Sequence, residues 1–142
     1  TILSGNSADI IGDAIQSAMD LGDQGLLIDT GILDATIEIA KSIAGSKLTI
    51  AHFKWVNDFA AARNFALVEA SKLRADIAMT LDTDERLLIS HANPRAFLES
   101  QFSNSGTTTV WMVSARCGTY KKERFFRLPV PERMKWTGRT YE

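Results

Sequence analysis

The hydrophobic positions along the chain change their spacing several times between its two ends. Four short apolar runs predict strands, at residues 1–4, 26–28, 47–53 and 76–81. The run 26–28 is wholly apolar, as in a strand that is buried on both faces. Between the runs, residues 8–20, 35–44 and 59–73 space their apolar side chains three and four positions apart, which predicts helices. This alternation predicts a parallel sheet with helices on both faces.

Residues that cap helices stand where the predicted helices begin. Ser7, Asp34 and Asp58 precede the first three helices, and Asn93 with Pro94 predicts a fourth helix that reaches residue 101. The third helix is predicted from the apolar spacing of Phe59, Ala62, Ala66, Ala70 and Leu73. Residues 107–116 and 122–128 are rich in β-branched and aromatic side chains, which predicts two further strands. No repeat or linker divides the sequence, so we expect one domain over residues 1–142.

The composition excludes several classes of protein. Hydrophobic residues make up 45% of the 142 residues and charged residues 23%, as in ordinary globular domains. Cys117 is the one cysteine, which excludes an internal disulfide framework and a cysteine-rich zinc site. The apolar runs are too short to span a membrane. The first charged residue is Asp9, where a secretory signal would be basic, so we expect a cytoplasmic protein.

The net charge of −1 hides an uneven distribution of charge along the chain. Residues 1–40 hold seven acids and no Lys or Arg, whereas residues 114–142 hold eight bases and three acids. We expect the basic end either to be a solvated surface or to face an anionic ligand or the headgroups of a membrane at its periphery. The Lys and Arg residues lack the density of a nucleic-acid-binding stripe, so we expect no nucleic-acid partner.

An acidic segment follows the fourth predicted strand. Asp82 and Asp84 are two positions apart, so an extended backbone directs both carboxylates to the same side. Two adjacent carboxylates repel each other unless a cation lies between them, and hard oxygen ligands suit Mg²⁺ or Mn²⁺. Ligands of parallel α/β sheets bind at the carboxyl ends of the strands, where this segment lies. The alternative is a solvated turn with helix-capping acids.

Three segments in order resemble family 2 glycosyltransferases of the GT-A fold, in particular the bacterial subgroup that modifies lipopolysaccharide cores or peptides. They read LIDTGILDATIEIA at 27–40, NDFAAARNFAL at 57–67 and LDTDERL at 81–87. The family has VDTGSTDGTVEIA, DFSAARNFAL and LDADExL in these places. Residues 124–127 and 136–142 resemble a weaker pattern, RxFR followed by GxxHE.

The resemblance implies an α/β fold, a Rossmann-like GT-A domain of three α/β/α layers with a mainly parallel central sheet. It implies that residues 1–142 form the nucleotide-sugar-binding domain of such an enzyme, cut short at the carboxyl end. The implied reaction is inverting and metal-dependent, with Mg²⁺ or Mn²⁺ as the cofactor. A sugar passes from a nucleotide-diphosphate donor to a hydroxyl group of a saccharide, a lipid-linked sugar or a peptide.

The resemblance also implies roles for individual residues. The residues that it implies bind the nucleotide sugar are Asp29, Thr30, Arg63, Asn64 and Asp82. Asp84 is implied as the direct metal ligand, and Asp82 as a residue that faces both the ribose and the metal. A carboxylate takes the proton of the acceptor hydroxyl. Glu142 is the first candidate for this base and Glu85 the second.

The sequence departs from the family pattern near the nucleotide and at the tail. Ile32, Leu33 and Ala35 replace residues that the family writes as Ser, Thr and Gly, and Tyr141 replaces its usual His. These departures favour an alternative, a catalytically inactive or truncated domain for nucleotide-sugar binding or interaction. A sugar nucleotidyltransferase shares the topology, but it carries a basic Gly-rich loop after the first strand, and residues 4–9 contain no base.

Overall fold

The computed structural model describes residues 1–103, 110–114 and 121–139, and within 110–114 the backbone alone. Strands β1 (Ile2–Ser4), β2 (Gly25–Asp29) and β3 (Leu48–His52) form a parallel sheet in the order β1-β2-β3. Strands β4 (Ile77–Met79), β5 (Val110–Ser114) and β6 (Lys121–Arg127) form an antiparallel sheet in the order β4-β6-β5. A parallel bridge between Ile2 and Leu81 joins the two sheets, so the chain after β4 runs beside β1.

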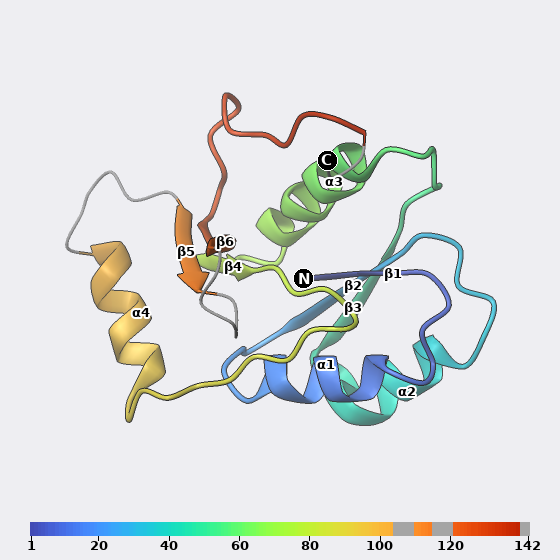
Figure 1. Ribbon diagram of the computed structural model, residues 1–142, viewed down its shortest axis with the longest axis horizontal. Coiled ribbons are helices and arrows are strands. Elements are labelled where there is room, and N and C mark those ends of the chain that lie inside the picture. Colours follow the sequence, from blue (N-terminus) through green and yellow to red (C-terminus); the bar gives the residue numbers. More distant parts are fainter. Residues whose placement is uncertain (104–109, 115–120, 140–142) are drawn as a thin grey trace.

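Helices cover both faces of the parallel sheet. Helices α1 (Ile11–Met19) and α2 (Thr36–Ala44) lie on one face, and α3 (Phe59–Lys72) lies on the other (Figure 1). A short 3-10 helix, η1 (Gly45–Lys47), leads from α2 into β3. The predicted three-layer α/β/α arrangement with a mainly parallel sheet is therefore confirmed.

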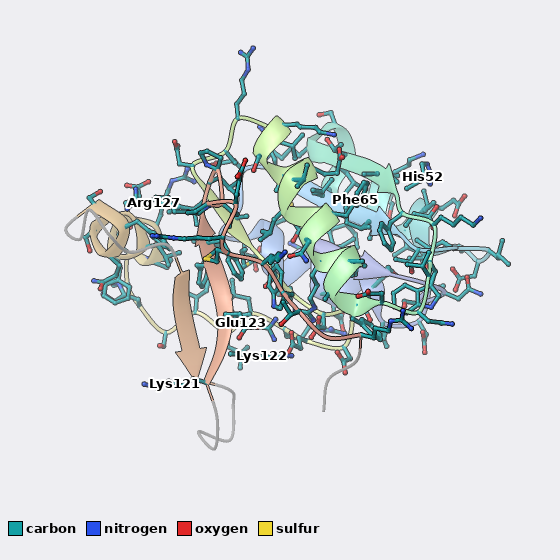
Figure 2. The ribbon with its side chains drawn as sticks, turned by 90° about the horizontal axis from the view of Figure 1, so that it is seen from above. His52, Phe65, Lys121, Lys122, Glu123 and Arg127 are labelled. Atoms are coloured by element: carbon teal, nitrogen blue, oxygen red, sulfur yellow. The ribbon has the colours of Figure 1, made fainter. Side chains whose placement is uncertain are left out.

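Helix α4 (Pro94–Ser103) lies apart from these layers, beside the antiparallel sheet (Figure 1). Arg127 at the end of β6 reaches α4, where its guanidinium donates to the carbonyl of Phe102 and lies 5.5 Å from the centre of that ring. Figure 2 shows this side chain extended from β6 toward the helix.

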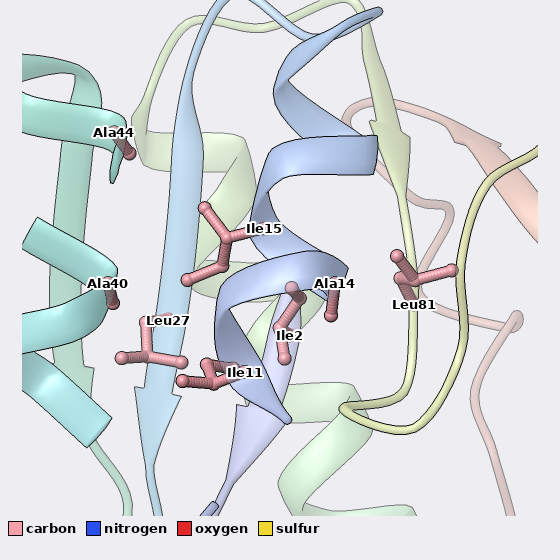
Figure 3. Close-up of a cluster of buried hydrophobic side chains, with 8 residues drawn as sticks. All are labelled: Ile2, Ile11, Ala14, Ile15, Leu27, Ala40, Ala44 and Leu81. Atoms are coloured by element: carbon pink, nitrogen blue, oxygen red, sulfur yellow. The ribbon is translucent and has the colours of Figure 1, made fainter. Parts of the chain in front are cut away.

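The apolar run of β2 supplies both cores, because successive side chains of a strand point to opposite faces. Leu27 points toward α1 and α2, and Leu26 and Ile28 point toward α3; all three are buried. The first core consists of Ile2, Ile11, Ala14, Ile15, Leu27, Ala40, Ala44 and Leu81 (Figure 3). The second consists of Leu26, Ile28, Ala66, Leu67, Ala70, Ala78, Phe126 and Leu128.

Two of the predicted helix caps act through their side chains as expected. Asp58 Oδ1 accepts a hydrogen bond of 2.8 Å from the amide of Ala61, and Asn93 Oδ1 accepts one of 3.2 Å from the amide of Ala96. Phe59, the first of the apolar positions that predict α3, is 40% exposed. Its ring packs edge-on against Trp55 in the preceding loop, with 4.8 Å between the ring centres.

The first two helices begin later than the sequence predicts. Helix α1 starts at Ile11 rather than near residue 8, and Ser7 caps it with its backbone carbonyl, which accepts from Ile10 and Ile11, not with its side chain. Helix α2 starts at Thr36, whose amide and hydroxyl both donate to Asp34 Oδ1. Asp34 therefore stabilises the start of α2 from two residues away.

Candidate functional site

The predicted site segments meet at one edge of the sheet, where the parallel strands end. Ser4, Asp29 and His52 are the last residues of β1, β2 and β3, and the register pairs Ser4 with Asp29 and Asp29 with His52. Asp82 follows Leu81, which pairs with Ile2 of β1. Segments that are far apart in the sequence therefore place their polar side chains at the same edge.

Asp29 is held by neutral donors and one imidazole. Its Oδ1 accepts from the amides of Gly31 and Ile32 at 2.8 and 2.7 Å, and its Oδ2 lies 2.8 Å from His52 Nδ1. Burial alone would raise the pKa of Asp29, but the hydrogen bonds from Ile32, Gly31 and His52 outweigh it and hold the pKa below its usual value. Asp29 is therefore an ionised acceptor at neutral pH.

Thr30, the residue after Asp29, binds the end of the neighbouring strand β1. Its amide and its hydroxyl both donate to the carbonyl of Ser4, at 3.0 and 2.9 Å. The hydroxyl proton is thus committed to the backbone, and its oxygen retains the capacity to accept from a ligand. The role of Thr30 in a nucleotide pocket stays a prediction, and in the structure Thr30 ties the loop after β2 to the end of β1.

Asp82 lies among three cationic side chains. Its Oδ1 accepts from Arg63 at 2.9 Å and its Oδ2 from Lys122 at 2.8 Å, and Arg124 lies 3.9 Å from Oδ2. Burial would raise the pKa of Asp82, but the hydrogen bond from Lys122 and the charges of Arg63, Lys122 and Arg124 outweigh it and lower the pKa. Asp82 is therefore ionised, and its negative charge is more than balanced.

Glu85 completes this group, which we call the charged cluster: Arg63, Asp82, Glu85, Lys122 and Arg124. Glu85 Oε1 accepts from Lys122 at 3.0 Å and from Arg124, and Oε2 accepts from the amide of Asp82 at 3.0 Å. Three cations face two carboxylates, so the charged cluster carries a net charge of +1. Both carboxylate oxygens of Glu85 are therefore engaged in hydrogen bonds within the charged cluster.

Arg63 and Asn64 connect the cluster to the chain that follows β6. Arg63 is 7% exposed, and its guanidinium lies 5.7 Å from the centre of the Trp136 ring. The amide side chain of Asn64 exchanges two hydrogen bonds of 2.9 Å with the backbone of Trp136. The amide of Phe59 donates to the carbonyl of Arg139, so the segment returns over α3 to its amino end (Figure 1). Asn64 therefore anchors this segment, and the predicted base, Glu142, lies outside the described residues.

His52 and Lys122 belong to the site although the sequence did not identify them. His52 is the last residue of β3, and an isolated histidine at a strand end carries no signal of function. On β6, Lys122 and Arg124 are two positions apart and so share a face, whereas Arg127 has the opposite parity. This spacing was the one available signal, and it carries no indication of which face meets Asp82. Figure 2 shows Lys122 between Lys121 and Glu123 on β6.

The part of the chain that the structure describes offers few side chains that could bind a metal ion. No three His, Cys, Asp or Glu side chains there gather in the manner of a metal site. Asp84 is exposed, and among the described residues it forms no ion pair. Mg²⁺ commonly takes one or two carboxylates and completes its shell with phosphates and water. The residues therefore fit a divalent cation that a bound diphosphate supplies with most of its ligands, with Asp84 as the accessible carboxylate.

No known protein-family profile matches this sequence. The chain is 37% identical over 84 residues to a TPR repeat-containing protein of Synechococcus elongatus. That match covers 59% of this chain and 19% of the cyanobacterial protein, so the chain spans about a fifth of that relative. The fold is similar to the crystal structure of residues 1–349 of TarS from S. aureus, a glycosyltransferase, with a TM-score of 0.60 and 14% identity. The similarity covers 89% of this chain and 45% of TarS 1–349, and it shows a glycosyltransferase-like fold.

The segment shared with the cyanobacterial protein does not consist of TPR units. A TPR unit is a pair of helices of 34 residues without a strand. In this chain a strand separates each described α-helix from the next, and any stretch of 84 residues contains strands. The shared segment of this chain is therefore α/β. Within the described ranges, the helices are also too short or too polar to cross a membrane.

Proposed function

We propose that this chain is the donor-binding domain of an inverting glycosyltransferase. The observation that carries the proposal is the convergence of its three motif segments at one sheet edge, where Asp29 and the charged cluster lie in a glycosyltransferase-like fold. In this proposal, a sugar passes from a nucleoside-diphosphate donor to a hydroxyl group of an acceptor.

The two parts of the edge suit the two parts of the donor. Asp29 is an ionised acceptor, which matches the N–H and O–H donors of a nucleobase and a ribose. The charged cluster has an excess of positive charge, which matches a diphosphate, because Arg and Lys side chains donate charge-assisted hydrogen bonds to phosphate oxygens. We therefore assign the nucleoside to Asp29 and Thr30, and the diphosphate to Arg63 and Lys122.

A divalent cation, Mg²⁺ or Mn²⁺, belongs to the proposal as a cofactor. Asp84 would hold it, with Asp82 beside it. When bound, such an ion neutralises the negative charge of the diphosphate as this group leaves the sugar. Arg63 adds a fixed positive charge on the protein side, since its burial and its contact with Trp136 keep it in place.

The proposed transfer is a single displacement at the anomeric carbon. The acceptor oxygen forms a bond to that carbon, the bond from the carbon to the diphosphate oxygen breaks, and the leaving diphosphate takes the electron pair. A carboxylate accepts the proton of the acceptor hydroxyl. Because both oxygens of Glu85 are engaged, we assign this step to Glu142.

The partners and location follow from the same reading. The acceptor would be a saccharide, a lipid-linked sugar or a peptide with a hydroxyl group, and nucleic acid would not bind. We propose a cytoplasmic location, where nucleotide sugars are made, with peripheral membrane contact through the basic residues of 114–142.

One observation favours a second candidate, a domain that binds a nucleotide sugar without turnover. Leu33 is 91% exposed in the loop after Asp29, at a place where the related family carries a hydroxyl. A leucine side chain cannot make the hydrogen bonds of that hydroxyl. In this candidate the site keeps its affinity for the donor and serves in assembly.

Calorimetry with UDP, GDP, CDP and ADP tests the proposal, with and without Mn²⁺. Asp84→Asn should weaken Mn²⁺-dependent binding about tenfold, because it removes the accessible carboxylate. Asp76→Asn is the matched control, since Asp76 is also exposed and directly precedes β4, whereas Asp84 follows that strand. Failure of all four nucleotides to bind the folded chain would overturn both candidates. A nucleotide sugar of the base that binds then distinguishes the two candidates. An enzyme hydrolyses or transfers the sugar of this donor, whereas a binding domain leaves the donor intact.

A further inference from the structure

We propose that Lys122 is a resident counter-cation that keeps divalent metal away from Asp82 and Glu85 until a diphosphate binds. The part played by the diphosphate rests on the proposed function. The part played by Lys122 in the ligand-free protein rests on the geometry alone.

A single ammonium group joins the two carboxylates. Lys122 Nζ lies 2.8 Å from Asp82 Oδ2 and 3.0 Å from Glu85 Oε1, so it occupies the space between the two residues. An ammonium is a compact point charge with three donors, and these contacts use two of them.

The charge balance of the cluster opposes a lone metal ion. Arg63, Lys122 and Arg124 carry three positive charges against the two negative charges of Asp82 and Glu85. A divalent cation added beside the ammonium would raise the net charge of the cluster from +1 to +3. It could reach the two carboxylates only by displacing the ammonium, and the net charge would still rise to +2. A diphosphate brings negative charge, which reverses this balance and gives the ammonium new acceptors.

Among the three cations of the cluster, Lys122 is the one able to move. Arg63 is buried beneath Trp136, and Arg124 is 6% exposed and also donates to the carbonyl of Thr80. The side chain of Lys122 is 26% exposed and lies near the first residue of β6 (Figure 2). A flexible four-carbon stem then lets the ammonium turn from the carboxylates to a phosphate oxygen while the guanidiniums stay fixed.

Binding of Mn²⁺ to the full chain without nucleotide tests the proposal, measured by loss of the free-ion electron paramagnetic resonance signal. Lys122→Met keeps the length of the side chain and removes its charge, and it should bind Mn²⁺ about tenfold or more tightly than the wild type. Lys121→Met, the exposed neighbour on β6, should behave as the wild type. Equal Mn²⁺ affinity in the wild type and Lys122→Met would overturn the proposal.

A second measurement uses the wild type alone and so does not depend on the folding of a variant. UDP should tighten Mn²⁺ binding about tenfold or more, and by linkage Mn²⁺ should tighten UDP binding by the same factor. Mn²⁺ that binds equally well with and without bound UDP would contradict a resident counter-cation. If no nucleotide binds at all, the proposed function fails, whereas the comparison without nucleotide still decides the role of Lys122.

Discussion

Asp29 and Asp82 are both carboxylates at the carboxyl edge of the sheet, but their partners are of different kinds. Asp29 accepts from two backbone amides and pairs with His52. Asp82 accepts from Arg63 and Lys122, with Arg124 close by. The pKa of each is lowered against the effect of burial, for Asp29 mainly by neutral donors and for Asp82 by a lysine hydrogen bond and cationic charges.

This difference determines what each carboxylate can offer to a ligand. Amide donors stabilise the negative charge of Asp29 without cancelling it, so Asp29 stays an acceptor for neutral donors of a ligand. The cations around Asp82 overcompensate its charge, so the cluster attracts anions. A nucleoside diphosphate has a neutral end with hydrogen-bond donors, which suits Asp29, and an anionic end, which suits the charged cluster.

The largest expected effect is a loss of folding stability on replacement of Arg63, the buried arginine of the charged cluster that pairs with Asp82. Arg63→Met should lower the free energy of unfolding by about 3 kcal/mol, because it leaves Asp82 partly buried without one of its cations and removes the contact with Trp136. Urea denaturation measures it, with the exposed Arg133→Met as the control. An equal unfolding midpoint for Arg63→Met and the wild type would show that the Arg63–Asp82 pair adds nothing to stability.

The next effect separates the two regions by ligand. Asp29→Asn keeps an oxygen for the amides of Gly31 and Ile32 but removes the charge, so the affinity for a nucleoside should fall about tenfold. The affinity for inorganic diphosphate should not change. Asp34→Asn, another carboxylate that accepts from backbone amides, is the control. A loss of diphosphate affinity in Asp29→Asn would contradict the separation of the two regions by ligand.

Acid should weaken the fold through both carboxylates. Each has a lowered pKa in the folded state, so the unfolded state binds more protons near the usual pKa of aspartate, about 3.9. Their contribution is therefore present above about pH 4 and is lost as the pH falls through the folded pKa. Unfolding midpoints measured from pH 7 to pH 3 should fall less steeply for Asp82→Asn than for the wild type. Parallel curves would contradict the pairing of Asp82 with its cations.

The smallest effect belongs to His52, whose side chain is 76% exposed. His52→Ala removes one of the three partners of Asp29 and should weaken nucleoside binding about threefold, the effect of one exposed hydrogen bond. His91→Ala is the control, because His91 stacks on Phe97 at the start of α4, outside the site. An unchanged affinity would mean that the two amides alone orient Asp29.

The sequence predicts the elements and motifs that are local, and it fails where contacts are distant. The order of strands and helices, the cap at Asp58 and the place of Asp82 after a buried strand all follow from nearby residues. The partners of Asp82 do not, because Lys122 and Arg124 arrive through the antiparallel pairing of β6 with β4, about 40 residues away. Register between distant strands leaves no local pattern, so neither the net charge of the cluster nor the engagement of Glu85 could be predicted.

The central claim is that the two regions together bind a nucleoside diphosphate. Calorimetric titration of the same protein with a nucleoside, with inorganic diphosphate and with the corresponding nucleoside diphosphate tests this most directly. We predict that the nucleoside diphosphate binds at least tenfold more tightly than either half, since one molecule engages Asp29 and the charged cluster at once. A nucleoside diphosphate that binds no more tightly than its better half would contradict the claim.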